Sequence, residues 1–342
     1  MDAEHSLVPD AAAGFKVYEL LFGLIVSQGI YVAAKLGIAD LIAKTPMNAD
    51  ELAAATNTHP QSLRRMLEML ASKGVFTEGK DGTFHNSPMS ATLCSDAQPS
   101  MRDTSLMLGA RFVRNAWGEL LDAVCTGEPA FERIHGMSLF SYLLANPEDA
   151  AVLSAGMTSG SSLDVAAVIA AYDFSKFHTI VDVGGSHGAL LAGILGANPN
   201  LHAILADMPP VVASADLLRK SAVADRCEFA GIDFFQTVPQ GGDAYILKWV
   251  IHDWSDDDAL KILHNCRRAI KPEGTLLLIE HILKPANEFD LGRMLDVGVM
   301  TLAKGRERTE REYQQLLQSA GFALRRVIAT GALLSIIEST PV

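Results

Sequence analysis

The chain is organised around the stretch TIVDVGGSHG, residues 179–188. Ile180, Val181 and Val183 are β-branched and apolar, which is typical of a strand that is buried on both faces. The glycines that follow allow the backbone to turn sharply and to approach a ligand closely. From Ala189 an apolar segment predicts a helix, whose first N–H groups have no partner within the helix. The pattern therefore indicates a strand, a turn and a helix that together bind a small molecule.

Strands and helices alternate on the C-terminal side of this stretch. Apolar runs predict four further strands at residues 202–206, 227–231, 244–247 and 275–279. Helices are predicted to begin near Ala189, Pro210, Asp256 and Thr309. Residues 323–329 and 332–338 flank a Thr-Gly turn and predict a terminal antiparallel hairpin. We therefore expect an α/β fold with a doubly wound, mostly parallel sheet, which binds ligands at the carboxyl ends of its strands.

The N-terminal part of the chain follows a different plan. Residues 15–36 are apolar nearly all round a helix, so this helix must be covered on most sides, and a second copy of the chain is one cover. Asn48 and Glu51 have the spacing of a capping box, and Pro60 is placed to open the next helix. The KDG turn at residues 80–82 predicts a hairpin. Helix, turn, helix and hairpin together make a winged-helix plan.

Winged helices often bind DNA, but the charge of this chain argues against that function. The formal net charge is −12, whereas nucleic-acid binding requires a positive surface. The second helix of the plan offers few cations, with Glu68 between them, namely Arg64, Arg65 and Lys73. We expect this part to form a homodimer, with no nucleic acid as partner. A DNA-binding regulator that senses a small molecule is the alternative from another functional class.

The sequence predicts neither a membrane protein nor a metal site. The N-terminus is acidic (MDAE), where a signal peptide would be basic. Residues 20–34 are apolar but short, because a membrane helix needs about 20 apolar residues. The four cysteines lie far apart and include no CxxC pair. We expect a cytoplasmic chain with no membrane partner and no metal.

The middle of the chain is predicted to be helical, at residues 101–126, 138–144 and 148–172. Methionine and aromatic residues are frequent there, and they either pack in a core or line a pocket for a flat apolar ligand. They are Met107, Phe112, Trp117, Met137, Phe140 and Met157. We expect three regions: a winged-helix-like dimerisation domain at 1–100, a helical, substrate-lining region at 101–172, and a catalytic domain at 173–342.

The spacing of the glycines separates two classes of ligand. A nicotinamide site would show G-x-G-x-x-G after the first strand, and Gly184, Gly185 and Gly188 fit that spacing poorly. The turn is more similar to the acidic-x-G-x-G-x-G turn of methyltransferases that use S-adenosylmethionine (SAM), with Ser186 in place of one glycine. The glycine turn therefore favours SAM over a dinucleotide.

Acidic residues at the next two strand ends agree with SAM. Asp207 ends the second strand, roughly 20 residues after the glycine turn, where a carboxylate can accept hydrogen bonds from both hydroxyls of a ribose. Asp233 and Phe234 follow the third strand, where the acid can meet the exocyclic amine of adenine and the ring can pack. Either carboxylate could instead cap a helix or lie on the surface. Their common position at strand ends favours the cofactor.

The fourth strand leads into KWVIHDWSD, residues 248–256. With this stretch the chain resembles the plant caffeate-type and acetylserotonin-type O-methyltransferases and their bacterial relatives. The resemblance covers nearly the whole chain. It includes the N-terminal winged-helix region, VDVGG at residues 181–185, Pro272 with Gly274, and ERT at residues 307–309.

The resemblance implies a catalytic set and a cofactor set. His252 corresponds to the general base of the family, and Glu280 and Glu307 to the two glutamates that flank and orient that histidine. The cofactor is SAM, and the family's contacts to it correspond to Gly184, Asp207, Asp233, Phe234 and Lys248. Ser186 and His187 depart from the family pattern in the glycine turn. Residues 100–170 match loosely, so the resemblance does not identify the methyl acceptor.

Methyl transfer to a phenol requires the removal of a proton. A phenol with a pKa near 10 is mostly protonated at pH 7, and forming the phenolate there costs about 4 kcal/mol. A neutral imidazole can accept this proton, and a carboxylate on its other nitrogen would fix the tautomer. We therefore expect a metal-independent SAM-dependent O-methyltransferase that acts on a small hydroxylated aromatic molecule. An enzyme of the same fold that performs N-methylation, or SAM-assisted decarboxylation or hydroxylation, is the nearer alternative.

Overall fold

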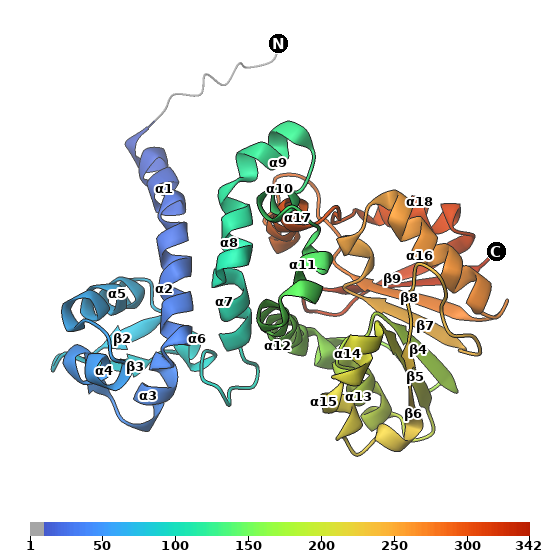
Figure 1. The fold of residues 1–342 in the computed structure, drawn as a ribbon, viewed down its shortest axis with the longest axis horizontal. Helices are drawn as coiled ribbons and strands as arrows, with labels where there is room; N and C mark the ends of the chain where they lie inside the picture. The colour runs from blue at the N-terminus through green and yellow to red at the C-terminus, as the bar shows by residue number, and fades with distance from the viewer. Residues whose placement is uncertain (1–9) are drawn as a thin grey trace, which may run out of the picture. The chain divides into compact units, whose positions relative to one another are not determined.

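The computed structural model describes residues 10–342, apart from the side chains of residues 161–163. The chain forms two compact units that divide between Ala110 and Arg111 (Figure 1). The helical residues 101–172 are thus shared between the two units.

The N-terminal unit has the predicted winged-helix plan. Its helices are α1 (Ala11–Leu21), α2 (Gly23–Lys35), α3 (Ile38–Lys44), α4 (Ala49–Thr56), α5 (Pro60–Ser72), α6 (Pro88–Ala91) and α7 (Arg102–Gly109). Its strands β1 (Met47–Asn48), β2 (Phe76–Glu78) and β3 (Thr83–Asn86) form an antiparallel sheet in the order β1-β3-β2. The capping box at α4 is confirmed, because the Asn48 side chain accepts hydrogen bonds from the amides of Asp50 and Glu51, each at 3.0 Å. The Glu51 carboxylate accepts in return from the Asn48 amide at 2.8 Å.

The α1–α2 segment is apolar and exposed. It forms a helical stretch of 25 residues, Ala11–Lys35, that is long and apolar enough to cross a membrane, and only 17% of its most apolar window is buried. The expectation that this segment is too short for a membrane is therefore wrong. Two further helical pieces, Pro147–Gly160 and Asp164–Ala171, pass the same test only as a pair bent by 44°. Phe15 is 76% exposed and Leu20 is 79% exposed, so the segment needs a cover that the described residues of its own unit do not supply.

The second unit begins with five helices: α8 (Arg111–Gly118), α9 (Leu120–Thr126), α10 (Ala130–His135), α11 (Leu139–Ala145) and α12 (Pro147–Ala171). The continuous helix predicted over 101–126 is wrong. The chain leaves helical geometry at Ala110, where ψ is 145°, and again at Glu119, where ψ is 27°. The short helix α10 was not predicted; it ends at His135, because Gly136 takes up the left-handed backbone that terminates a helix.

The predicted doubly wound sheet is confirmed. Seven strands lie in the order β6-β5-β4-β7-β8-β10-β9. They are β4 (Thr179–Val183), β5 (His202–Asp207), β6 (Cys227–Gly231), β7 (Ala244–Lys248), β8 (Thr275–Glu280), β9 (Phe322–Ala329) and β10 (Ser335–Pro341). Strands β4 to β8 pair in parallel, and β10 pairs antiparallel with both β8 and β9. The terminal hairpin is therefore present, with its second strand inside the sheet.

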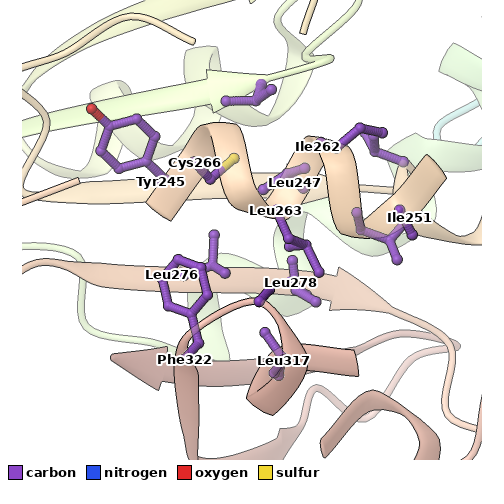
Figure 2. Close-up of a cluster of buried hydrophobic side chains, with 14 of the residues drawn as sticks. Tyr245, Leu247, Ile251, Ile262, Leu263, Cys266, Leu276, Leu278, Leu317 and Phe322 are labelled. Carbon is purple, nitrogen blue, oxygen red and sulfur yellow. The ribbon is translucent and has the colours of Figure 1, made fainter. Parts of the chain in front are cut away.

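Helices cover both faces of the sheet (Figure 1). They are α13 (Ala189–Ala197), α14 (Pro209–Ala213), α15 (Asp216–Arg219), α16 (Asp256–Ala269) and α18 (Glu310–Ser319). Helix α17 (Leu291–Leu302) packs instead against α8, α9 and α10. On one face Leu247 and Leu278 pack with Leu263 of α16 and Leu317 of α18, all fully buried (Figure 2). Alternate residues such as Ile246 pack on the other face with α13. The carboxyl ends of β4, β5, β7 and β8 are thereby held rigidly at one edge.

Candidate active site

The glycine turn after β4 has an unusual backbone. Gly184 and Gly188 have φ values of +74° and +76°, in the left-handed region that favours glycine. Ser186 has φ of +52° although it carries a side chain. A Cβ atom at Gly184 would lie 2.8 Å from a methyl carbon of Val250 and 3.7 Å from the Phe234 ring. The Val250 side chain therefore packs directly against the backbone of Gly184, with the Phe234 ring beside it.

Asp207 lies beside this turn, at the end of β5. One of its carboxylate oxygens accepts a hydrogen bond from the Ser186 amide at 2.8 Å, and the other accepts from the Met208 amide at 2.7 Å. Burial raises the pKa of Asp207, and the two amide hydrogen bonds oppose that rise. Each oxygen keeps a further acceptor position, so the carboxylate is fixed in place and can still receive two hydroxyls. This acceptor fits the hydroxyls of the SAM ribose.

Phe234 and Asp233 follow β6 on the same edge. The Phe234 ring packs edge-on against Phe235 and Trp254, with ring centroids 5.1 Å and 5.9 Å apart. One carboxylate oxygen of Asp233 accepts from the Phe235 amide at 2.9 Å, and the residue is exposed. The structure thus brings Phe234 to the glycine turn with Asp233 beside it, which fits an adenine that stacks on a ring and donates to an acid.

Lys248 ends β7 among carboxylates. Burial lowers the pKa of Lys248, while the charges of Asp164, Asp182 and Glu280 oppose the change. Asp182 is itself buried in β4, and burial raises its pKa to about 7. The lysine therefore lies among these acids at the carboxyl end of β7, which runs between β4 and β8.

His252 and Glu307 form a buried pair. The His252 side chain is 7% exposed, and its Nδ1 lies 2.8 Å from a Glu307 carboxylate oxygen. Because a carboxylate accepts, Nδ1 carries the proton, and Nε2 of the neutral ring is the acceptor. Among residues 10–342, Nε2 has no hydrogen-bond partner; it lies 3.5 Å from a carboxylate oxygen of Asp253. Glu307 is fixed in turn, since its amide donates to Asp296 at 2.8 Å.

Glu280 contacts the backbone that carries His252. One of its carboxylate oxygens accepts hydrogen bonds from the amides of Val250 and Ile251, at 3.0 Å and 2.8 Å. The side chain is fully buried, and burial raises its pKa to about 7. Glu280 thus holds the segment before the histidine, whereas Glu307 contacts the ring.

The carboxylates around His252 set its proton affinity. Burial alone would lower the pKa of His252, but the charge of Asp253, the hydrogen bond to Glu307 and the charge of Glu280 together raise it to about 9. The ring therefore holds its second proton up to high pH, and it releases that proton more readily when another positive charge lies close by.

Several residues at this site had no role in the sequence analysis. The Trp249 ring lies against the His252 ring, with centroids 4.7 Å apart, and its indole N–H donates to Asp164 at 3.3 Å. A side chain at Gly305 would collide with the main chain of His252. Arg308 reaches the same segment from the other side. Trp249 and Arg308 stand in the motifs KW and ERT, which signalled their positions but not their contacts.

Two aromatic residues of the middle region, Phe112 and Phe140, lie in different surroundings. Phe112 is 4% exposed and belongs to a packed interior. Phe140 stacks on Trp254, with centroids 5.1 Å apart and planes 18° apart, and so lies next to the His252 segment.

Family profiles match this chain in both units. Residues 18–96 match the O-methyltransferase dimerisation domain, and residues 117–323 match the O-methyltransferase domain. The chain belongs to this family of O-methyltransferases. The winged-helix unit is accordingly a dimerisation domain, and the predicted family is confirmed.

Individual relatives agree with this family. The chain is 42% identical to a phenazine O-methyltransferase of Lysobacter antibioticus over 325 residues, 95% of each chain. The crystal structure of LaPhzM matches with a TM-score of 0.92 and 41% identity, over 98% of this chain and 100% of that chain. The O-methyltransferase NcsB1 of neocarzinostatin biosynthesis, solved with SAM and 2-hydroxy-5-methyl naphthoic acid, matches with a TM-score of 0.80 and 30% identity, over 93% and 96%.

The chain is therefore a SAM-dependent O-methyltransferase of secondary metabolism, and the predicted cofactor is confirmed. The family is one of soluble enzymes. The glycine turn, Asp207 and Phe234 fit the cofactor by their own geometry, as described above.

Proposed function

We propose that this enzyme methylates a phenolic hydroxyl of a small, flat aromatic molecule, with His252 as the general base. The observation that carries the proposal is the buried His252 ring, whose Nδ1 lies on Glu307 while Nε2 has no partner in the described part of the chain. Glu307 fixes the tautomer that leaves Nε2 as acceptor, and Glu280 holds the backbone before the ring. Gly184, Asp207, Asp233, Phe234 and Lys248 bind the cofactor in this proposal.

SAM supplies a methyl group on a positively charged sulfur, already activated for displacement by an oxygen. The protein has to hold the acceptor oxygen in line and take its proton. With His252 at a pKa of about 9, proton transfer from a phenol of pKa about 10 is uphill by roughly 1.4 kcal/mol. The transfer leaves a phenolate beside an imidazolium, and their attraction offsets part of that cost.

Only the neutral form of His252 can accept a proton. The rate should therefore rise with pH as His252 loses its second proton, and level off above the pKa of the ring. A bound positive charge next to the ring lowers this pKa, because it disfavours the imidazolium.

The surroundings of His252 favour a flat aromatic acceptor. Trp249 lies on one side of the ring, and the stacked pair Phe140 and Trp254 lies close along the chain. Aromatic walls bind planar molecules by stacking. A phenazine O-methyltransferase and an enzyme solved with a naphthoic acid are similar over nearly their whole length. A hydroxylated polycyclic aromatic molecule is therefore our proposed acceptor class.

We further propose that the enzyme is a homodimer through its N-terminal unit. The exposed apolar residues of α1 and α2 and the match to a dimerisation domain support this proposal. A cleft of about 430 Å³ runs beside α2 and is lined in part by Gly23, Val26, Ile30 and Leu108, which gives a second chain an apolar surface to enter. The four cysteines of the described chain are free, as expected of a protein in the reducing cytoplasm.

The proposal is tested with methyl-labelled SAM and a set of hydroxylated phenazines and naphthoic acids, with each product located on the ring. His252→Ala should lower kcat by roughly 10²–10⁴-fold and leave SAM affinity within about threefold. His264→Ala on α16 is the matched control, since His264 is exposed. Full activity in His252→Ala would remove His252 as the base. A product methylated on nitrogen would replace the phenolic acceptor with an amine.

A further inference from the structure

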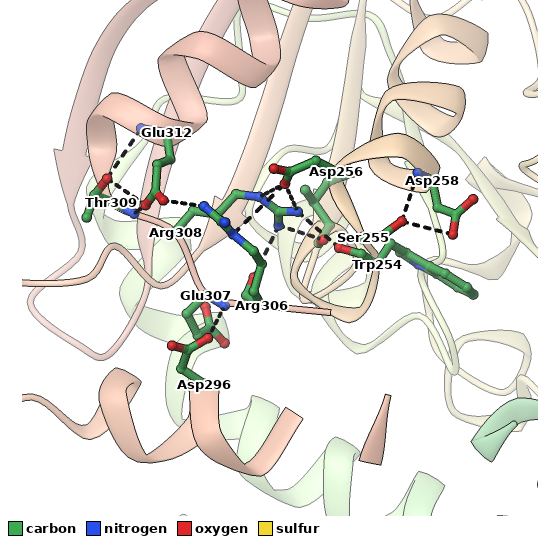
Figure 3. Close-up of polar contacts among 11 residues, drawn as sticks. Trp254, Ser255, Asp256, Asp258, Asp296, Arg306, Glu307, Arg308, Thr309 and Glu312 are labelled. Atoms are coloured by element: carbon green, nitrogen blue, oxygen red, sulfur yellow. Dashed lines mark hydrogen bonds and ion pairs between the residues drawn. The ribbon is translucent and has the colours of Figure 1, made fainter. Parts of the chain in front are cut away.

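The Arg308 guanidinium is buried beside the His252 segment. The residue is 0% exposed and is the largest fully buried side chain of the described chain. One terminal nitrogen donates to the carbonyl oxygens of Ile251 and Arg306, at 3.0 Å and 3.1 Å (Figure 3). The other donates to the carbonyl oxygen of Trp254 at 3.0 Å. Arg308 therefore holds the main chain on both sides of His252 and Asp253.

Asp256 compensates the charge of Arg308. Its Oδ1 accepts from Nε at 3.0 Å and from the terminal nitrogen at 2.7 Å (Figure 3). Asp256 is the first residue of α16, and its side chain is 54% exposed. The buried cation is thus paired with a carboxylate at the surface. It also donates to carbonyl oxygens and lies over the Tyr313 ring, 6.0 Å from the ring centroid. Burying the guanidinium costs desolvation free energy, and an ion pair often recovers only part of it. We therefore expect Arg308 to have a role other than stabilising the fold.

The backbone of Arg308 is itself anchored to the end of β8. Ile282 forms a parallel bridge with Arg308, and the Leu283 amide donates to the Arg308 carbonyl at 3.0 Å. Glu280, two residues before Ile282, holds the amides of Val250 and Ile251. The His252 segment is therefore held from its amide side by Glu280 and from its carbonyl side by Arg308.

Contacts of the residues before Arg308 reach the histidine directly. Gly305 passes against the His252 main chain, where a Cβ atom would collide, and Glu307 holds the ring through Nδ1. His252 itself lies in a single turn of 3₁₀ helix, Ile251–Asp253, which has little stability of its own. The place of Nε2 therefore depends on contacts from residues 305–308.

We propose that Arg308 is a positioning residue, which fixes the His252 segment so that Nε2 faces the hydroxyl of the acceptor. This inference rests on the proposed role of His252. The planar guanidinium can donate in several directions at once, to carbonyls that flank the histidine and to Asp256, whereas a lysine ammonium concentrates its donors at one point. A shift of about 1 Å at the base costs on the order of 10²-fold in rate.

Two variants and one control test this inference. Arg308→Lys keeps the positive charge but loses most of the hydrogen-bond donors of the guanidinium. Asp256→Asn weakens the ion pair by removing the negative charge of its exposed partner. Asp257→Asn is the matched control, because Asp257 is exposed, lies in the same helical turn and has no contact with Arg308. We expect kcat to fall about 30-fold or more in Arg308→Lys and about threefold to tenfold in Asp256→Asn. SAM affinity by calorimetry should change by less than about threefold, and Asp257→Asn should match the wild type.

The pH profile separates positioning from simple loss of folded protein. A looser segment weakens the contact of Nδ1 with Glu307, so the pKa of His252 falls and the acid limb of kcat moves to lower pH. A smaller folded fraction would lower kcat equally at every pH. Wild-type kcat in folded Asp256→Asn, or a loss with an unmoved acid limb, would overturn the inference. If Arg308→Lys does not fold, the comparison of kcat and its pH profile between Asp256→Asn and Asp257→Asn decides. Wild-type activity in His252→Ala would instead overturn the proposed function.

Discussion

Replacing Glu307 by glutamine should change the pH dependence of the enzyme in a characteristic way. The carboxylates around His252 raise its pKa to about 9, well above the ordinary value, which corresponds to roughly 3 kcal/mol of net stabilisation of the imidazolium. Glu307 provides both a charge and the hydrogen bond at Nδ1, while the charges of Asp253 and Glu280 remain in the variant. We expect Glu307→Gln to lower the pKa by roughly one unit, or about 1.4 kcal/mol.

The lower pKa of His252 in Glu307→Gln offsets part of the activity that the variant loses because its ring is poorly oriented. At pH 7 a ring with a pKa of about 9 is roughly 1% neutral, and a ring with a pKa of about 8 is roughly 9% neutral. The poorly oriented glutamine contact should lower the plateau of kcat/KM by roughly 10²-fold. The loss of kcat/KM in Glu307→Gln relative to the wild type should therefore be about tenfold smaller at pH 7 than at pH 10.

The assay is kcat/KM for the acceptor between pH 6 and 10.5 at saturating SAM. Glu310→Gln is the control, since Glu310 is exposed and lies three residues away in the same segment. The variant should show its acid limb at lower pH than both the wild type and this control. A deficit that is equal at all pH values, or larger at low pH, would show that the limb belongs to another group.

Two further predictions concern the cofactor and the assembly. Asp207→Ala should weaken SAM binding by roughly tenfold to 100-fold in calorimetry, because the ribose hydroxyls lose a fixed charged acceptor; unchanged affinity would remove Asp207 from the cofactor site. Leu20→Glu should shift the enzyme from dimer to monomer in analytical ultracentrifugation, because the change places a charge in an apolar interface, while Lys16→Glu on the same helix serves as the control. A dimeric Leu20→Glu protein would show that the chains meet elsewhere.

Much of the fold of both units could be predicted because its signals are local. The strand β4 and its glycine turn, the capping box of α4 and the terminal hairpin all depend on residues close together in the chain. The prediction failed where local propensity was misleading. Residues 101–126 are largely helical in character, yet the chain breaks at Ala110 and Glu119. Gly109 and Gly118 stand directly before these breaks, and a single glycine within a helical pattern is a weak signal for a helix end.

The contacts of the site could not be predicted in the same way. His252 and Glu307 are 55 residues apart, and Arg308 and Ile251 are 57 apart, so no spacing in the sequence relates them. The motif around Glu280 pointed to the histidine ring, whereas the structure places the carboxylate on two amides. A motif gives the identity of a residue at a site, but the direction of its side chain depends on packing far along the chain.

The left-handed backbone of two residues limits how this enzyme can be made more heat-resistant. Four described residues other than glycine have positive φ: Asn57, Ser186, Trp249 and Asn287. Asparagine tolerates this geometry, whereas serine and tryptophan pay roughly 1–2 kcal/mol for it. Glycine at position 186 or 249 would release that strain, but it would loosen the turn that holds Asp207 or remove the ring against His252. The stabilising substitutions that the backbone offers most readily therefore fall where activity depends on the native side chain.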